Sequence, residues 1–168
     1  MKLRVSTILL SFAVSLALLA TIAFVYDRLS LQRPLQEWLM QNANVRVVSL
    51  DTGFRRVDLQ VELTPDQDLA DFHQQLLQRV GSARLTLHLM DNPSEEMERQ
   101  WEKSLFTLEQ AIRRDEYALI PPEMERRKKD FEVVSAQLRQ QYLYIRWAEG
   151  ENQLLRILPT VREEEVIP

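Results

Sequence analysis

The chain of 168 residues contains no cysteine, three glycines and two histidines, and each scarcity removes a class of site. Without cysteine the chain can form neither disulfides nor thiolate metal sites. The glycines, at positions 53, 81 and 150, lie too far apart to form a loop that wraps a phosphate group. His73 and His88 show no ligand spacing for zinc. The sequence therefore predicts a protein without a metal or other cofactor.

An excess of basic residues is also missing, since 21 lysines and arginines stand against 25 acidic residues for a net charge of −4. Proteins that bind nucleic acid usually carry a clear basic excess, so nucleic acid is not an expected partner. The densest run of cations, Arg126–Lys129, could grip an anionic lipid headgroup. Four acidic residues stand within one helical turn of it: Glu123, Glu125, Asp130 and Glu132. This pairing pattern favours a solvated helix face.

Signs of catalysis are equally sparse. Asp66, Asp68 and Asp71 lack the glycine and the distant glutamate of a calcium loop, and acids at this spacing are typical of the first turn of a helix. No serine lies in a nucleophile-elbow motif. A triad can assemble from distant positions, so a hydrolase using His73 or His88 stays open. The sequence predicts a protein that is not an enzyme.

The uncharged run Val5–Tyr26 has the length of a membrane span, about 20 residues, rather than the shorter apolar core of a signal peptide. Its best cleavage site ends at Ala23 and is followed by further apolar residues, which favours an uncleaved anchor. Lys2 and Arg4 precede the run, and positive charge tends to stay on the cytoplasmic side. We therefore expect a single-pass protein of a bacterial cell membrane with a cytoplasmic head (1–4), an anchor (5–26) and an extracytoplasmic C-terminal domain.

Residues 27–44 form an amphipathic juxtamembrane segment, and residues 45–90 read as β-β-α-β. Alternation in "VDLQVEL" indicates a half-buried strand. Thr64-Pro65-Asp66-Gln67 has the pattern of a helix start, Gly81 that of a helix end, and a third strand follows. This order is similar to that of BON domains and of the ring-building domains of secretion and sporulation machines. The resemblance is one of element order.

The rest of the chain is expected to form a helical hairpin (93–141), a β-hairpin from Tyr142 to Leu158, and a flexible acidic tail (159–168). The first helix starts at Asn92-Pro93-Ser94-Glu95, and Pro121-Pro122 separates it from a second helix that runs to Gln141. The predicted fold class is α+β: a single N-terminal transmembrane helix followed by a small mixed α/β domain (45–158) made of β-β-α-β, helical hairpin and β-hairpin.

These features predict a non-catalytic, membrane-anchored extracytoplasmic module for protein–protein interaction or assembly in the cell envelope. Its expected partners are the lipid bilayer and either another envelope protein or a second copy of the chain. One alternative is a ligand-sensing domain that uses the aromatic residues of "YLYIRW", and another is the tethered hydrolase. The candidate interaction surface comprises apolar and aromatic side chains of the hairpins: Trp101, Leu105, Leu108, Phe131, Tyr142, Tyr144 and Trp147.

Overall fold

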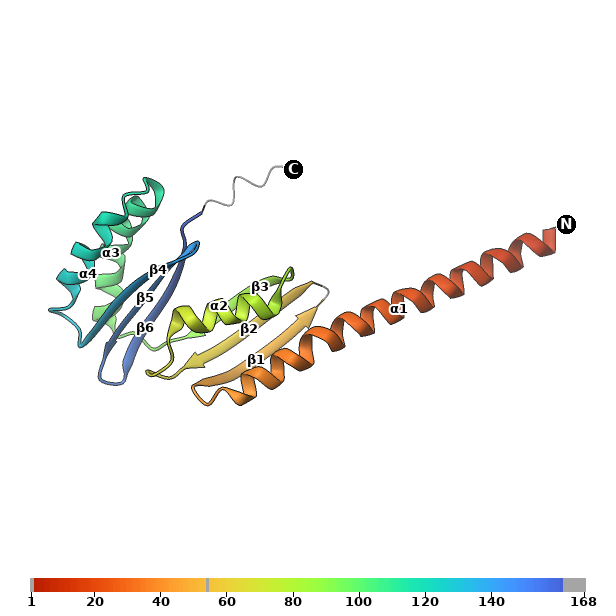
Figure 1. Cartoon of the computed structure of the whole chain (residues 1–168), viewed down its shortest axis with the longest axis horizontal. Coiled ribbons are helices and arrows are strands. Elements are labelled where there is room, and N and C mark those ends of the chain that lie inside the picture. Colours follow the sequence, from red (N-terminus) through yellow and green to blue (C-terminus); the bar gives the residue numbers. More distant parts are fainter. Residues whose placement is uncertain (1, 54, 162–168) are drawn as a thin grey trace. The chain divides into compact units, whose positions relative to one another are not determined.

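The computed structural model describes residues 2–53 and 55–161 and, within the first helix, the side chains of residues 9–22 and 32–41. Figure 1 shows the elements. The helices are α1 (Lys2–Gln41), α2 (Leu69–Val80), α3 (Glu95–Arg113), the 3-10 turn η1 (Tyr117–Leu119) and α4 (Ile120–Arg127). The strands are β1 (Val45–Gly53), β2 (Arg56–Leu63), β3 (Arg84–Met90), β4 (Val133–Arg139), β5 (Tyr142–Glu149) and β6 (Asn152–Pro159). The predicted tail lies outside the described residues from position 162 onward.

The strands form two three-stranded sheets, in the orders β1-β2-β3 and β4-β5-β6. The chain divides into two compact units. Unit 1 comprises Met1–Val61 and Gln75–His88, and unit 2 comprises Glu62–Gln74 and Leu89–Pro168.

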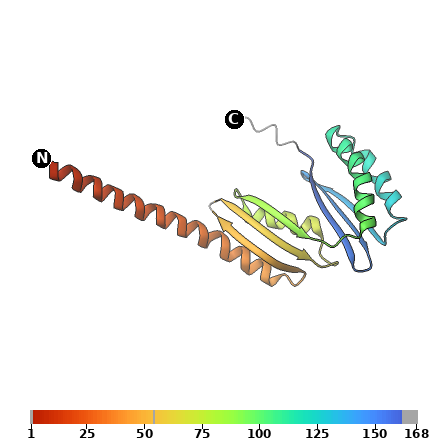
Figure 2. The ribbon, with the colours of Figure 1, turned by 180° about the vertical axis from the view of Figure 1, so that it is seen from behind.

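Unit 1 buries one face of its sheet. Val57, Leu59 and Val61 of β2 are fully buried, while the residues between them keep contact with solvent, as the alternating pattern predicts. Helices cover this face, and the opposite face of the sheet carries no helix in Figure 2. The indole ring of Trp38 in α1 lies 4.4 Å from the guanidinium carbon of Arg79 in α2, a cation–π contact between the two helices.

The structure corrects the predicted membrane anchor. No helix in the described part of the chain is long and apolar enough to span a membrane. Helix α1 is continuous over 40 residues, so polar residues of the expected juxtamembrane segment belong to the same helix as the apolar run. The predicted transmembrane anchor over 5–26, the single-pass cell-membrane localisation and the orientation derived from it are wrong.

Unit 2 is built on the antiparallel sheet β4-β5-β6, in which Val134 pairs with Trp147 and Trp147 with Leu154. Helices α3 and α4 cover one face of this sheet (Figure 1). The core between them contains eleven buried side chains: Met97, Trp101, Leu108, Ala111, Ile120, Met124, Phe131, Leu143, Ile145, Trp147 and Leu154. Residues 62–74 of the same unit lie against the other face of the sheet, where the candidate site is found.

The predicted helical hairpin is also wrong, because its second helix ends at Arg127 and residues Val133–Arg139 form strand β4. The sequence "FEVVSAQLR" has apolar residues at helical spacing, but it also alternates, with Val134, Ala136 and Leu138 on one side. Pairing with β5 and packing of Val134 and Ala136 on the core decide in favour of the strand. The predicted fold class therefore fails in its transmembrane helix and in its helical hairpin.

Candidate functional site

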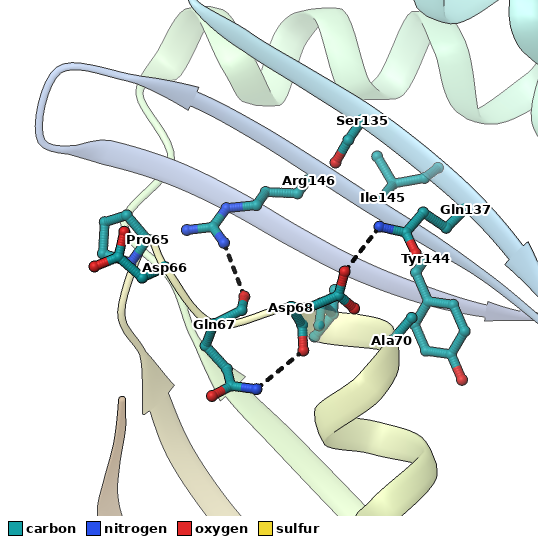
Figure 3. A pocket seen from close by; sticks show the side chains of 11 residues that line it. Pro65, Asp66, Gln67, Asp68, Ala70, Ser135, Gln137, Tyr144, Ile145 and Arg146 are labelled. Atoms are coloured by element: carbon teal, nitrogen blue, oxygen red, sulfur yellow. Dashed lines mark hydrogen bonds between the residues drawn. The ribbon is translucent and has the colours of Figure 1, made fainter. Parts of the chain in front are cut away.

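A polar hollow of about 220 Å³ lies within unit 2, where the turn that precedes α2 meets the sheet (Figure 3). Residues 65–70 form one side of it. The other side comes from two strands: Ser135 and Gln137 of β4, and Tyr144, Ile145 and Arg146 of β5. The hollow is lined by three charged side chains: Asp66, Asp68 and Arg146.

Arg146 extends across the hollow and holds the turn against the sheet. Its Nη1 donates to the carbonyl oxygen of Gln67 at 3.0 Å, and its Nη2 donates to the carbonyl oxygen of Thr64 at 3.4 Å. The same Nη2 donates to Oε1 of Gln153 at 3.2 Å. Burial lowers the pKa of Arg146, and the charges of Asp66 and Asp68 act in the opposite direction. The hydrogen bonds of the guanidinium group therefore go to carbonyl oxygens of the chain itself.

Asp68 caps helix α2. Its Oδ1 accepts a hydrogen bond from the backbone N–H of Asp71 at 2.9 Å, and its Oδ2 accepts one from Nε2 of Gln137 at 3.0 Å. Burial raises the pKa of Asp68, but these hydrogen bonds and the charge of Arg139 outweigh it, so the pKa lies below its usual value. The cap of the helix thus lies four positions beyond Thr64, where the sequence pattern predicts the helix start.

His73 lies further along α2 and faces the sheet. It is 6% exposed, and its Nδ1 lies 3.0 Å from the hydroxyl oxygen of Tyr144. The rings of Tyr142 and Tyr144 meet it edge to face at 4.8 and 5.6 Å. Burial lowers the pKa of His73 to about 4, and burial also raises the pKa of Tyr144. The imidazole is therefore neutral near pH 7 and packs as an aromatic ring.

These contacts give little support to the hydrolase alternative. The hydrogen bond that the structure gives His73 is to a phenol rather than to a serine or carboxylate, and His88 lies exposed on β3. Among the side chains that the structure describes, no three histidine, aspartate or glutamate residues gather as a metal site.

The candidate interaction residues occupy the interior of unit 2. Trp101, Leu108, Phe131 and Trp147 are core residues, with the Phe131 ring stacked on Trp147 at 5.3 Å. Leu105 packs on this core partly buried. Tyr144 is buried and Tyr142 half-buried, both beside His73. Their positions assign these seven side chains to packing, and a role for them in binding stays a prediction.

A second candidate binding surface is the β4 edge of the sheet β4-β5-β6, which the residue types in the sequence did not indicate. Strands β4 and β5 are joined by the two residues Gln140 and Gln141, so Arg139 and Tyr142 form the last hydrogen-bonded pair of the hairpin. Because inward and outward groups alternate along a strand, Ser135 and Gln137 also bond to β5. The backbone N–H and C=O groups of three β4 residues then point away from the sheet: Val134, Ala136 and Leu138.

The opposite edge of the sheet, β6, follows the same alternation, and two of its outward residues are covered. The two-residue turn between β5 and β6 makes Gln153 and Leu155 point outward by the same reasoning. Gln153 exchanges hydrogen bonds with Asn92, one each way at 3.2 Å, and the N–H of Leu155 donates to Oδ2 of Asp91 at 3.0 Å. Asn92, the expected helix cap, thus protects an edge, and Ser94 caps α3 instead.

Strand β4 has no comparable cover. In the part of the chain that the structure describes, no hydrogen bond reaches the outward backbone groups of Val134, Ala136 or Leu138. At either end of the strand Val133 and Leu138 are 45% and 46% exposed. The strand contains no proline or lysine, two residue types that commonly blunt an edge. Unit 2 therefore presents one edge, β6, that is covered at Gln153 and Leu155, and one edge, β4, without such cover.

The chain matches no protein-family model, no curated protein and no solved structure. The BON-like order of residues 45–90 accordingly carries no assignment, and the function has to be inferred from the geometry of the site itself.

Proposed function

We propose that this chain is a non-catalytic protein–protein interaction module that binds an extended strand of another polypeptide along β4. The observation that carries the proposal is the row of outward backbone groups at Val134, Ala136 and Leu138, which have no partner among the described residues. Such a row is a template for strand addition, in which main-chain hydrogen bonds give affinity and alternate side chains give specificity.

The contrast between the two edges of one sheet supports this reading. The β6 edge carries Asp91 and Asn92 as hydrogen-bonding partners, and the β4 edge carries none among the described residues. An added strand on β4 would also cover the exposed parts of Val133 and Leu138, which adds an apolar contribution of about 25 cal/mol per Å² buried.

The hollow supports ligand sensing less well. Its volume of about 220 Å³ is below the about 300 Å³ at which small-molecule pockets usually begin. Arg146 already donates to the turn that precedes α2, and Asp68 already caps α2. A ligand that binds these two side chains would have to replace their internal hydrogen bonds, which costs free energy.

Strand addition is tested by removing an outward donor without touching the β4–β5 ladder. Ala136→Pro deletes an N–H that points away from β5 and places the ring in the path of an incoming strand. The tagged full-length chain is isolated from the cells in which it occurs. We expect the amount of partner protein recovered with Ala136→Pro to be about tenfold or more below that recovered with the wild type, equivalent to about 1.4 kcal/mol of binding free energy. An untagged copy of the chain is expressed in the same cells, so that the isolated material shows whether the partner is a second copy or a different protein.

Ile157→Pro is the matched control, because the N–H of Ile157 also points outward, but from the β6 edge. Recovery with this variant should equal that of the wild type. Equal recovery with all three chains would contradict strand addition at β4.

A further inference from the structure

We infer that the strand bound at β4 is the β4 strand of a second copy, paired antiparallel and centred on Ala136. This inference rests on the proposed function and names the partner for the same edge. It follows from the order of residues in β4, "VVSAQLR", read against itself in the reverse direction.

A two-fold axis at Ala136 places residues of like character opposite one another. Ala136 faces its own copy, and Val134 faces Leu138 of the second copy, so apolar side chains meet on the side of the sheet that packs on the core. On the other side Ser135 faces Gln137 of the second copy, a pair of hydrogen-bonding side chains. No residue in this register sets a polar group against the apolar core side.

Charge also fits this register. Arg139 is the single charged residue of the strand, and the pairing sets it opposite Val133 of the second copy, not opposite another arginine. Like charges directly opposite each other destabilise a pair of strands, and this arrangement avoids them. Arg139 is in addition paired with Asp71 of its own chain, which offsets its charge. The aliphatic stem of the arginine can cover the exposed Val133.

The backbone groups match in the same register. The outward residues Val134, Ala136 and Leu138 meet Leu138, Ala136 and Val134 of the second copy, and each of these three pairs exchanges both its hydrogen bonds. All outward groups of the strand are then used. The β4-β5-β6 sheets of the two copies then form one continuous six-stranded sheet. The pair is closed by its two-fold axis, so no β4 edge is left to bind a third copy.

The register can be tested with single cysteines, because the chain has none of its own. Ser135 and Gln137 of the second copy form a non-hydrogen-bonded pair with about 4.5 Å between their Cα atoms, within the range of a disulfide. Full-length Ser135→Cys and Gln137→Cys chains with different tags are expressed together and oxidised mildly in intact cells. We expect a mixed disulfide that joins the two tags.

Each variant expressed alone is the register control. Positions 135 and 135 of two copies are diagonal neighbours about 7–8 Å apart, beyond the usual span of a disulfide, and the same holds for 137. A mixed disulfide lost when Ala136→Pro is added to both chains supports the inference. A second variant pair, Val134→Cys with Leu138→Cys, reports the same register if the first pair fails to fold.

Absence of both mixed disulfides in folded chains overturns the inference. If a different protein is then still recovered with the wild-type chain and lost with Ala136→Pro, the proposed function stands and the partner is that protein. If no partner depends on Ala136, the proposed function fails as well. Disulfides that form equally in each variant alone would show random collision and would also overturn the register.

Discussion

Glu123→Leu is expected to lower the free energy of unfolding by about 3–5 kcal/mol, because it removes the nearest and most buried counter-ion of Arg127. Glu123 is 2% exposed, and its Oε1 accepts hydrogen bonds from the hydroxyl of Ser104 at 2.7 Å and from Nη2 of Arg127 at 2.9 Å. The side chain of Arg127 is 13% exposed. Arg126 adds a contact at 3.1 Å to the other carboxylate oxygen. This network ties α4 to α3.

The matched control is Glu125→Leu, two residues further along the same helix. Glu125 is 70% exposed and pairs with Lys128, so its loss should change stability by about 0.5 kcal/mol or less. Urea unfolding of both full-length variants measures the difference. Similar small changes for both would contradict the assignment of Glu123 to a buried network.

The same network predicts a loss of stability in acid. Burial raises the pKa of Glu123, but the hydrogen bonds from Ser104 and Arg127 and the two arginine charges outweigh it, so the folded-state pKa lies below the usual 4.5. The contribution of the ion pair is therefore complete above pH 4.5 and is lost as the pH falls through the lower folded-state value.

His73 produces a second acid effect, at higher pH. We expect stability to fall by about 3 kcal/mol between pH 6.5 and pH 4, because the pKa of His73 is about 4 when buried and 6.5 in the unfolded chain. In this window the unfolded chain takes up a proton that the folded chain excludes, so acid favours unfolding. Above pH 6.5 both states are neutral and the contribution is constant.

His73→Phe isolates this effect. Phenylalanine keeps an aromatic ring between Tyr142 and Tyr144 but cannot be protonated, although it leaves the Tyr144 hydroxyl without its partner. The variant should therefore be less stable than the wild type at pH 7 by a modest amount, and this deficit should shrink or reverse by pH 4. A deficit that is the same at pH 7, 5.5 and 4 would show that His73 does not titrate with folding.

The sequence predicts much of the local structure because apolar spacing is a local property. The alternation through Val57, Leu59 and Val61 gives strand β2, and the spacing from Met97 to Leu108 gives helix α3. Prediction from local spacing fails where the helical and the strand pattern overlap. Residues 131–139 satisfy both the helical and the strand spacing, and only the long-range pairing with β5 decides between them.

Polar residues were harder to place than apolar ones. The sequence offered Thr64 and Asn92 as helix caps, yet Asp68 and Ser94 take those roles. Asn92 instead serves a strand that lies far along the chain. A polar side chain can satisfy many backbone groups, and which group it meets depends on tertiary structure.

The candidate site was missed for a related reason. Prediction from residue types directs attention to large apolar and aromatic side chains, and those became the core around Trp147. The open edge at β4 consists of backbone groups next to small or polar side chains. Its sequence signal, the absence of proline and lysine from "VVSAQLR", acquires meaning only once the strand order places β4 at an edge.

Amide hydrogen exchange along β4 tests the central claim, that this edge binds another strand, most directly. In the assembled full-length chain the amides of Val134 and Leu138 should exchange slowly, and in Ala136→Pro they should exchange fast. The amides of Ser135 and Gln137, which bond to β5, should be protected in both chains and so report that β4 itself is intact. If Val134 and Leu138 exchange fast in the wild type as well, the β4 edge binds no strand and the account is wrong.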